Sequence, residues 1–335
     1  MDLIRAVGLA AHLARPDPRP GFPSTLWVDG SPVECLVYEP PSPRGTVLAV
    51  HGLSLRAHRD PRIVSVCRAL EAVGFRVVCP RVASLADLRL DPELAPHLAA
   101  AAGAVLAHPR WGAPTIGWFA ASFAAGMSIV AAASAPVAAR VSGMFLVGAY
   151  ADPWALLRHV AASADPYGRL VAVRALVDLA PPVARAVEVA LQDLSLRREP
   201  QLGQVLDQLH AADRRRFEVL AAPGPLAVPA HRADGVERLA VAPAVCSLRA
   251  SVTLVHGRHD VVVPPSESVR LMDLFGRNGV RARLHLTDLL DHGDLSSGVG
   301  AALEAPAVVA ALRFWLRSTG VAANPPNRAP TSTGS

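Results

Sequence analysis

Three short segments contain the side chains that nucleophilic catalysis on a carbonyl group needs: a hydroxyl, a carboxylate and an imidazole. Ser122, Asp260 and His292 occur in that order along the chain. A serine attacks a carbonyl carbon when a histidine takes its proton and a carboxylate orients that histidine. A fourth segment, His51-Gly52-Leu53-Ser54, contains a glycine and could present backbone N–H groups to a developing negative charge. Together the four segments point to acyl chemistry at a serine.

Each of these segments follows a stretch whose apolar residues predict a buried strand. The four strands are predicted at 46–50, 115–121, 251–255 and 281–286, and two more at 75–79 and 141–150. Helices are predicted at 61–73, 92–106, 123–139, 266–276 and 306–317. Alternating strands and helices favour a mostly parallel, doubly wound sheet with helices on both faces. Active groups in such a sheet gather at the carboxyl ends of the strands, where all four segments are predicted to lie.

The same pattern divides the chain into a body and an insertion. Asp29-Gly30 between two short strands predicts an N-terminal hairpin within 25–38. The alternation stops at Ala151, and up to about Leu248 the apolar residues follow a helical period. We therefore expect four parts: an N-terminal helix and linker (1–24), an α/β body (25–150 and 249–319), a helical cap insertion (151–248) and a disordered tail (320–335).

On these segments the chain resembles the α/β-hydrolase superfamily, from about Thr25 to Arg317. The matching pieces are TVLAVHGL, IGWFAASFAAG, VTLVHGRHDVVVPPSES and LHLTDLLDHGDL. The resemblance implies an α/β-hydrolase fold in which the insertion occupies the place of a cap domain.

The resemblance also implies a role for each candidate residue. Ser122 would be the nucleophile, His292 the general base and later the general acid, and Asp260 the group that orients the imidazole. The backbone N–H groups of Leu53 and Phe123 would form the oxyanion hole.

One feature departs from the superfamily pattern, in which the serine lies in a G-x-S-x-G turn. Ala120 and Ala124 replace the two glycines. The glycines are usual because the strained turn brings neighbouring backbone so close that a Cβ atom is hard to fit. Alanine is the smallest alternative and Gly126 keeps the helix start small, so we expect the turn to persist with a modest adjustment.

Each candidate residue also has a purely structural interpretation. Ser122 could cap the helix that follows it, Asp260 could order the turn before two prolines, and His292 could be a surface histidine between two aspartates. Asp152 follows the strand at 141–150 and is the alternative acid, because superfamily members can take the acid from that strand end.

His256, His259 and Asp260 are the residue types that bind metals, but no second group of ligands accompanies them. We predict neither a metal nor a cofactor. The composition agrees, because all 33 basic residues are arginine and the sequence contains no lysine. P-loop proteins, pyridoxal enzymes and protein kinases each need a lysine, so these classes are excluded. The net charge of +5 comes from arginines spread along the chain and does not indicate nucleic-acid binding.

The N-terminal residues 1–20 lack the pattern of a secretory signal and predict an amphipathic helix, with Leu3, Ile4, Val7 and Leu13 on one side. The four cysteines lack metal-ligand spacing and are predicted to be buried thiols in a reducing compartment. The uncharged stretch 111–139 is long enough to span a bilayer, but a strand, a turn and a buried helix explain it. We expect a cytoplasmic protein without a membrane span.

The favoured hypothesis is a serine hydrolase that cleaves a carboxylic ester, thioester or lactone through an acyl-enzyme on Ser122. Its partner would be a small-molecule substrate, with an apolar acyl or alcohol part. The two alanines motivate an alternative, a weak or inactive protein of the same fold that binds an apolar ligand or a partner. A third hypothesis is an acyltransferase that passes the same acyl group to an alcohol or an amine.

Overall fold

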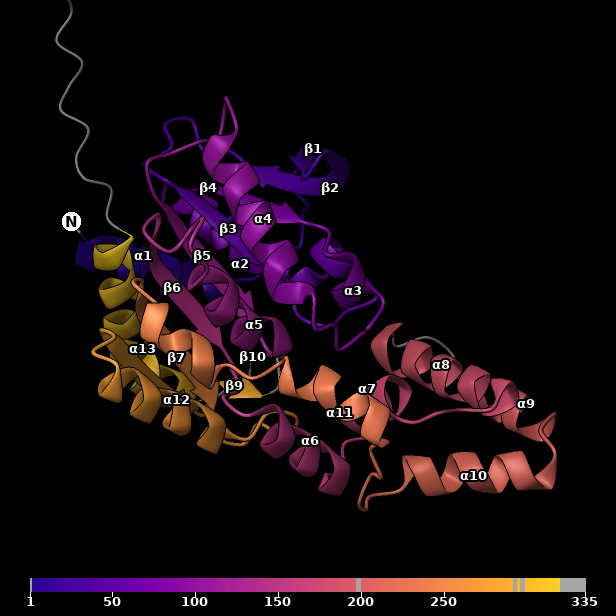
Figure 1. Cartoon of the computed structure of the whole chain (residues 1–335). Helices are drawn as coiled ribbons and strands as arrows, with labels where there is room; N and C mark the ends of the chain where they lie inside the picture. The colour runs from indigo at the N-terminus through magenta and orange to yellow at the C-terminus, as the bar shows by residue number, and fades with distance from the viewer. Residues whose placement is uncertain (1, 197–199, 292–293, 296–298, 320–335) are drawn as a thin grey trace, which may run out of the picture.

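The computed structural model describes residues 2–196, 200–291, 294–295 and 299–319, and its centre is an eight-stranded sheet (Figure 1). The strand order is β1-β2-β4-β3-β5-β6-β7-β8. The β1–β2 and β2–β4 pairs are antiparallel and the other pairs are parallel. The strands are β1 (Phe22–Val28), β2 (Ser31–Tyr38), β3 (Thr46–Val50), β4 (Arg76–Pro80), β5 (Ile116–Ala121), β6 (Val141–Val147), β7 (Ser251–Gly257) and β8 (Ala282–Thr287). The sheet is mostly parallel, as the sequence predicts.

Helices cover both faces of this sheet. Strand β3 is fully buried, with Leu48 and Val50 in one apolar core and Val47 and Ala49 in the other, because successive side chains of a strand point to opposite faces. A continuous apolar run is therefore typical of a strand covered on both sides. The first core includes α4 (Leu94–Ala107), α5 (Phe123–Ala132) and α12 (Pro265–Arg277), and the second includes α1 (Asp2–Leu13), α2 (Pro61–Ala72) and α13 (Val299–Ser318).

The predicted N-terminal hairpin is present. β1 and β2 pair directly through Asp29 and Gly30, whose φ angles are 48° and 78°. Two consecutive positive φ angles match the twist of the flanking strands, and aspartate followed by glycine is suited to this turn.

Between β6 and β7 the described residues form helices only, in a segment that we call the helical insert (residues 151–248). Leu170, Val187 and Leu191 are among the residues that give it an apolar core of its own. Figure 1 shows most of its helices extending away from the sheet. They are α6 (Pro153–Ala162), α7 (Pro166–Leu176), α8 (Pro181–Leu196), α9 (Leu202–Asp207), α10 (Ala211–Ala221), α11 (Ala230–Glu237) and the 3-10 segment η2 (Ala242–Ser247).

Four predicted boundaries were wrong by three residues or more. The hairpin begins at Phe22 rather than at 25. α5 ends at Ala132 rather than at 139, and turns that contain Pro136 lead into β6. β6 ends at Val147 rather than at 150, because Gly148 has a φ of 61° and cannot continue the strand. α13 begins at Val299 and contains Pro306 in its interior. The sequence predicts Pro306 as the first residue of this helix, because proline is common at the first position of helices.

Cys35, Cys67 and Cys79 are buried free thiols, as predicted, but Cys246 is exposed because it lies on the short η2 segment at the surface. The uncharged stretch 111–139 forms β5, a turn and α5. Within the described residues, no helix is both long and apolar enough to cross a membrane. The predicted disordered tail (320–335) lies outside the described residues.

Candidate active site

Ser122 lies at a sharp turn between β5 and α5. Its φ and ψ angles are 58° and −137°, a conformation that residues with a side chain rarely adopt. Its N–H donates to the carbonyl oxygen of Val147 on β6 at 2.7 Å, and its own carbonyl accepts from Ala125 at 2.8 Å. The Ser122 side chain makes no capping hydrogen bond to α5, although the residue occupies the N-cap position. The interpretation of Ser122 as a helix cap is therefore wrong.

The alanines that replace the usual glycines fit this turn. Ala120 and Ala124 are fully buried, and the backbone of Ser122 keeps its strained conformation between them. The closest approach occurs instead at Gly126, where an added Cβ atom would lie 2.4 Å from the ring of Tyr150. Position 126 therefore needs glycine, because a methyl group there would overlap the aromatic ring.

The loop after β3 passes beside Ser122. A Cβ atom added to Gly52 would lie 3.6 Å from the Cβ atom of Ser122, so the two backbones are close neighbours. His51 fixes this loop: its Nδ1 donates to the carbonyl oxygen of Gly52 at 2.7 Å, and its Nε2 accepts from the N–H of Val82 at 3.2 Å. Burial lowers the pKa of His51 to about 4, which keeps the ring neutral and Nε2 able to accept.

The peptide groups around Leu53 are held from both sides. The carbonyl oxygen of Leu53 accepts from the Tyr167 hydroxyl at 2.9 Å, and the next N–H, of Ser54, donates to Leu85 at 3.1 Å. Among the described residues, the N–H groups of Leu53 and Phe123 donate to no protein acceptor. Both N–H groups lie on the two segments that meet at Ser122, and the oxyanion hole that they would form stays a prediction.

Asp260 follows β7 in a tightly ordered turn. It is 7% exposed, and its Oδ1 accepts from the N–H groups of Val262 and Val263, both at 2.9 Å. Its Oδ2 would lie 3.5 Å from a Cβ atom added to Gly148, which directly follows β6. The carboxylate thus both orders its own turn and extends to the neighbouring strand end.

His256 supports this turn from within the fold. Its Nε2 donates to the carbonyl oxygen of Val263 at 2.8 Å, and its Nδ1 lies 2.6 Å from the hydroxyl of Ser268. Both ring nitrogens are therefore already bonded to protein. Among the residues that the structure describes, no group of three metal-binding side chains comes together.

His292 lies outside the described residues. The flanking pairs Leu290–Asp291 (β9) and Asp294–Leu295 (β10) form a short antiparallel ladder. The chain just before His292 passes against the end of β7, because a Cβ atom added to Gly257 would lie 2.1 Å from the carbonyl oxygen of Leu290. Gly257 therefore needs to be glycine for the segment that precedes His292 to approach the turn that contains Asp260.

Asp152, the alternative acid, caps α6. Its Oδ1 accepts from the N–H groups of Trp154 at 2.8 Å and Ala155 at 3.2 Å, and its side chain is 44% exposed. The carboxylate that is buried here is Glu267, which is 1% exposed and accepts from the N–H groups of Ala151 and Asp152 at 3.0 and 2.8 Å. The sequence did not predict this role, because a glutamate in the first turn of a helix is usually exposed.

The helical insert contacts the loops on both sides of the turn at Ser122. His159 and Ser163 on α6 and its C-terminal cap both donate to the carbonyl oxygen of Val261, at 3.0 and 3.1 Å. Tyr167 on α7 donates to Leu53, and burial raises the pKa of its hydroxyl, which therefore keeps its proton. These three residues were not predicted, since nothing in the helical pattern of the insert distinguishes them.

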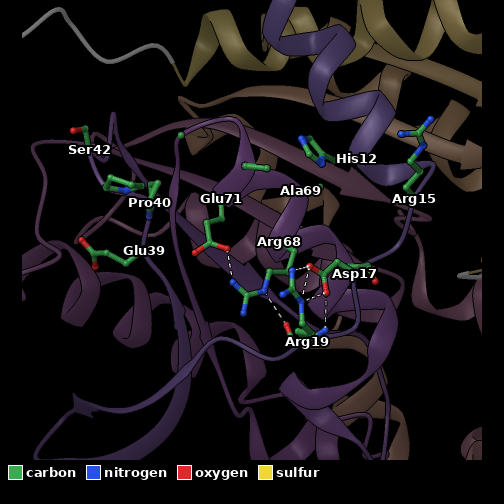
Figure 2. Close-up of a pocket in the computed structure, with 14 residues that line it drawn as sticks. His12, Arg15, Asp17, Arg19, Glu39, Pro40, Ser42, Arg68, Ala69 and Glu71 are labelled. Carbon is green, nitrogen blue, oxygen red and sulfur yellow. Dashed lines mark hydrogen bonds and ion pairs between the residues drawn. The ribbon is translucent and has the colours of Figure 1, made fainter.

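A hollow of about 620 Å³ opens elsewhere, near the end of α1 and of α2 (Figure 2). It lies by the 39–42 loop before β3, which is the amino edge of the parallel strands, opposite to Ser122. Its charged groups largely bond to one another: Arg19 to Asp17 at 2.6 Å, and Arg68 to Glu71 at 2.6 Å (Figure 2). The candidate active site is therefore not this hollow.

No protein-family model and no curated protein matches the sequence. Solved structures do match the fold. Dienelactone hydrolase from Anabaena variabilis aligns with a TM-score of 0.51 and 16% identity, over 88% of this chain and 96% of that one. Est1E from Butyrivibrio proteoclasticus aligns with a TM-score of 0.52 and 14% identity, over 89% and 98%.

Pyrococcus horikoshii acylaminoacyl peptidase aligns with a TM-score of 0.55 and 11% identity, over 92% of this chain but only 43% of the peptidase. These similarities agree with the eight-stranded, mostly parallel sheet flanked by helices. The chain therefore has the α/β-hydrolase fold.

Proposed function

We propose that the protein is a serine hydrolase that cleaves a carboxylic ester, thioester or lactone through an acyl-enzyme on Ser122. The observation that carries this proposal is the strained backbone of Ser122, which a hydrogen bond to Val147 holds in place. The side chain of Ser122 does not cap the helix. Backbone strain of this kind is concentrated at functional sites. A serine that only capped a helix would adopt an ordinary extended conformation instead.

In the proposed reaction, Oγ of Ser122 attacks the carbonyl carbon and its proton passes to His292. The N–H groups of Leu53 and Phe123 donate to the oxyanion of the tetrahedral intermediate. His292 then gives the proton to the leaving alcohol or thiol, and the acyl group stays on Ser122. Water attacks the acyl-enzyme by the same steps, which releases the acid and restores the serine.

Asp260 is the proposed partner of His292. Its turn is buried and lies beside the segment that leads to His292, whereas Asp152 already caps α6 and faces solvent. A carboxylate in this role orients the imidazole and stabilises its charged form.

The helical insert is the proposed cap, with a substrate that has an apolar part. The apolar cluster of the insert includes Leu53 and Leu55 from the loop beside Ser122, together with Tyr167 and Leu170. Apolar side chains on the loop beside the nucleophile suit an apolar acyl or alcohol group. The division of the chain into domains and the cytoplasmic location remain predictions.

The test is hydrolysis of a series of nitrophenyl esters of increasing chain length by the wild type and by Ser122→Ala. We expect wild-type turnover that depends on chain length, and a loss of several orders of magnitude in the variant. Added alcohol separates two outcomes, because an acyltransferase would form a new ester where a hydrolase forms the acid. Equal turnover by both proteins contradicts the proposal, and an inert wild type favours the ligand-binding alternative.

A further inference from the structure

The outer face of α1 carries large apolar side chains that the rest of the described chain does not cover. Ala6 and Leu9 are buried against the body, so the helix already has one apolar face in the core. The exposed fractions of Leu3, Ile4 and Val7 on the other side are 50%, 76% and 51%. A group of exposed aliphatic side chains on one helix is typical of a surface that binds something.

Beside this face lies a hollow of about 280 Å³ lined by arginines. Arg283 lies on β8, the edge strand of the sheet, and Arg281 directly precedes that strand. The other two arginines come from α13, and Leu3 of α1 lines the same hollow. The guanidinium groups of Arg281 and Arg283 both lie 4.8 Å from the ring centre of Phe314, which positions their charges at one place. The four are Arg281, Arg283, Arg313 and Arg317.

Most of these arginines have no carboxylate partner in the part of the chain that the structure describes. Among the described residues, Arg281, Arg283 and Arg313 form no ion pair, and Nε of Arg313 is buried without a hydrogen-bond partner. Arg317 has Asp2 as its partner, at 3.9 Å. The hollow in Figure 2 is different, because two of its three arginines, Arg19 and Arg68, are closely paired with carboxylates.

We propose that these residues form a docking surface for the face of a membrane that contains anionic lipids. We call it the α1 surface, defined by Leu3, Ile4, Val7, Arg281, Arg283 and Arg313. The aliphatic side chains enter the boundary between headgroups and acyl chains, and the arginines bind lipid phosphates. Helices that combine an apolar face with neighbouring arginines lie in this interface without crossing the bilayer.

Charge favours a bilayer over a second copy of the chain. Two copies joined symmetrically through the α1 surface would bring their unpaired arginines together, and like charges repel. Figure 1 shows α1 and the tip of the helical insert far apart in the molecule. Arg281 precedes the amino end of β8, and Ser122 follows the carboxyl end of β5, so docking leaves the candidate active site open.

The test is cosedimentation of the full chain with two kinds of vesicle, phosphatidylcholine alone and phosphatidylcholine mixed with phosphatidylglycerol. We expect binding to the anionic vesicles only, and a strong decrease when salt shortens the screening length from about 10 Å to about 3 Å. Replacing Arg281, Arg283 and Arg313 together by Gln should weaken binding on the order of 100-fold, at roughly fivefold per arginine. Ile4→Gln with Val7→Gln should also abolish most binding.

Two matched controls use exposed residues of α10 and α8. Replacing Arg214, Arg215 and Arg216 by Gln removes the same charge, and Val219→Gln with Leu194→Gln removes exposed aliphatic side chains. Both controls should bind like the wild type, and thermal unfolding should show that all variants fold. The proposal is overturned if the wild type ignores anionic vesicles, if the controls lose as much binding, or if ultracentrifugation shows a dimer that the Ile4 and Val7 changes dissociate.

Discussion

The loops at the carboxyl edge of the sheet and the helical insert are held by different kinds of contact. The loop that begins at His51 follows a fully buried strand. Its His51 ring accepts from the N–H group of Val82, and the N–H and hydroxyl groups of Ser54 donate to Leu85 and Asp60. The insert packs mainly around its own core. It meets the same loops through Tyr167, His159 and Ser163, which donate to backbone carbonyls.

This difference indicates what each region contributes. The body positions the groups that would react, by contacts that cannot change without disturbing the sheet. The insert contacts loops that are already ordered, through apolar side chains such as Leu53 and Leu55 and through single hydrogen bonds worth about 1 kcal/mol each. Substitutions in the body should therefore have large effects on chemistry or stability, and substitutions at the insert contacts should have small ones.

The largest expected effect separates the two candidate acids, Asp260 in the body and Asp152 in the helical insert. Asp260→Asn keeps an oxygen for the N–H groups of Val262 and Val263, so the turn should persist while turnover falls on the order of 10⁴-fold. Asp152→Asn is the matched control, because asparagine caps a helix as well as aspartate does. Steady-state kinetics on a nitrophenyl ester measures both, and a large loss confined to Asp152→Asn would reverse the assignment.

The next effect concerns stability in acid. Burial lowers the pKa of His51 to about 4 from 6.5, so below pH 6.5 the unfolded chain binds more protons than the folded one. Stability should decrease as the pH falls from 6.5 towards 4, with about 3 kcal/mol from this residue. His51→Gln should reduce this slope without abolishing it, because burial also lowers the pKa of His58.

Urea unfolding at several pH values measures the slope, and His97→Gln on the exposed side of α4 should leave it unchanged. The effect is distinct from that of Asp60. Burial raises the pKa of Asp60, but hydrogen bonds from Arg62 and Ser54 lower it overall to about 2. The stability that Asp60 contributes to the fold is therefore lost at a lower pH than the contribution of His51. An unaltered slope in His51→Gln would show that the loop does not need a neutral imidazole.

A smaller effect tests the insert directly. Tyr167→Phe removes the hydroxyl that bonds to Leu53, so the free energy of unfolding should fall by about 1 kcal/mol and kcat roughly 5- to 10-fold, while KM changes little. Ser163→Ala is the comparison, because Val261 keeps its bond from His159 and activity should stay within about twofold of the wild type. Loss of most activity in either variant would mean that the insert does more than adjust the loop.

The smallest effect is expected at the alanine that replaces the second glycine of the turn. Ala124→Gly should leave labelling of Ser122 by a fluorophosphonate probe intact. It should lower the free energy of unfolding by roughly 0.4–1 kcal/mol, because glycine increases the freedom of the unfolded chain. Chemical denaturation and a labelling time course measure the two quantities. A large gain in labelling would indicate that Ala124 holds the wild-type turn in an unreactive geometry.

The sequence predicted the sheet because each buried strand leaves a distinct apolar run. Ser122 and Asp260 were placed correctly at strand ends, since short strands give little freedom in where the following loop begins. Helix ends were less predictable, because Pro136 and Pro306 act in opposite ways: one lies in turns after a helix and the other inside one.

Contacts between distant segments could not be predicted from the sequence. Glu267, Tyr167 and Gly126 have their roles because of what packs against them, and those partners lie far away along the chain. The outward position of Ile4 is a similar case, because an apolar period indicates a helix but does not tell which of two apolar faces enters the core. His292 stays a prediction, since it lies outside the described residues.

The most direct test of Ser122 as the nucleophile is labelling with a fluorophosphonate probe, followed by peptide mapping, on the wild type and on Ser122→Ala. We predict a single labelled residue in the wild type, Ser122, and no labelling of a variant whose thermal unfolding matches that of the wild type. Labelling of the variant to the same extent, or a wild type that does not react at all, would contradict the claim that Ser122 is an activated nucleophile.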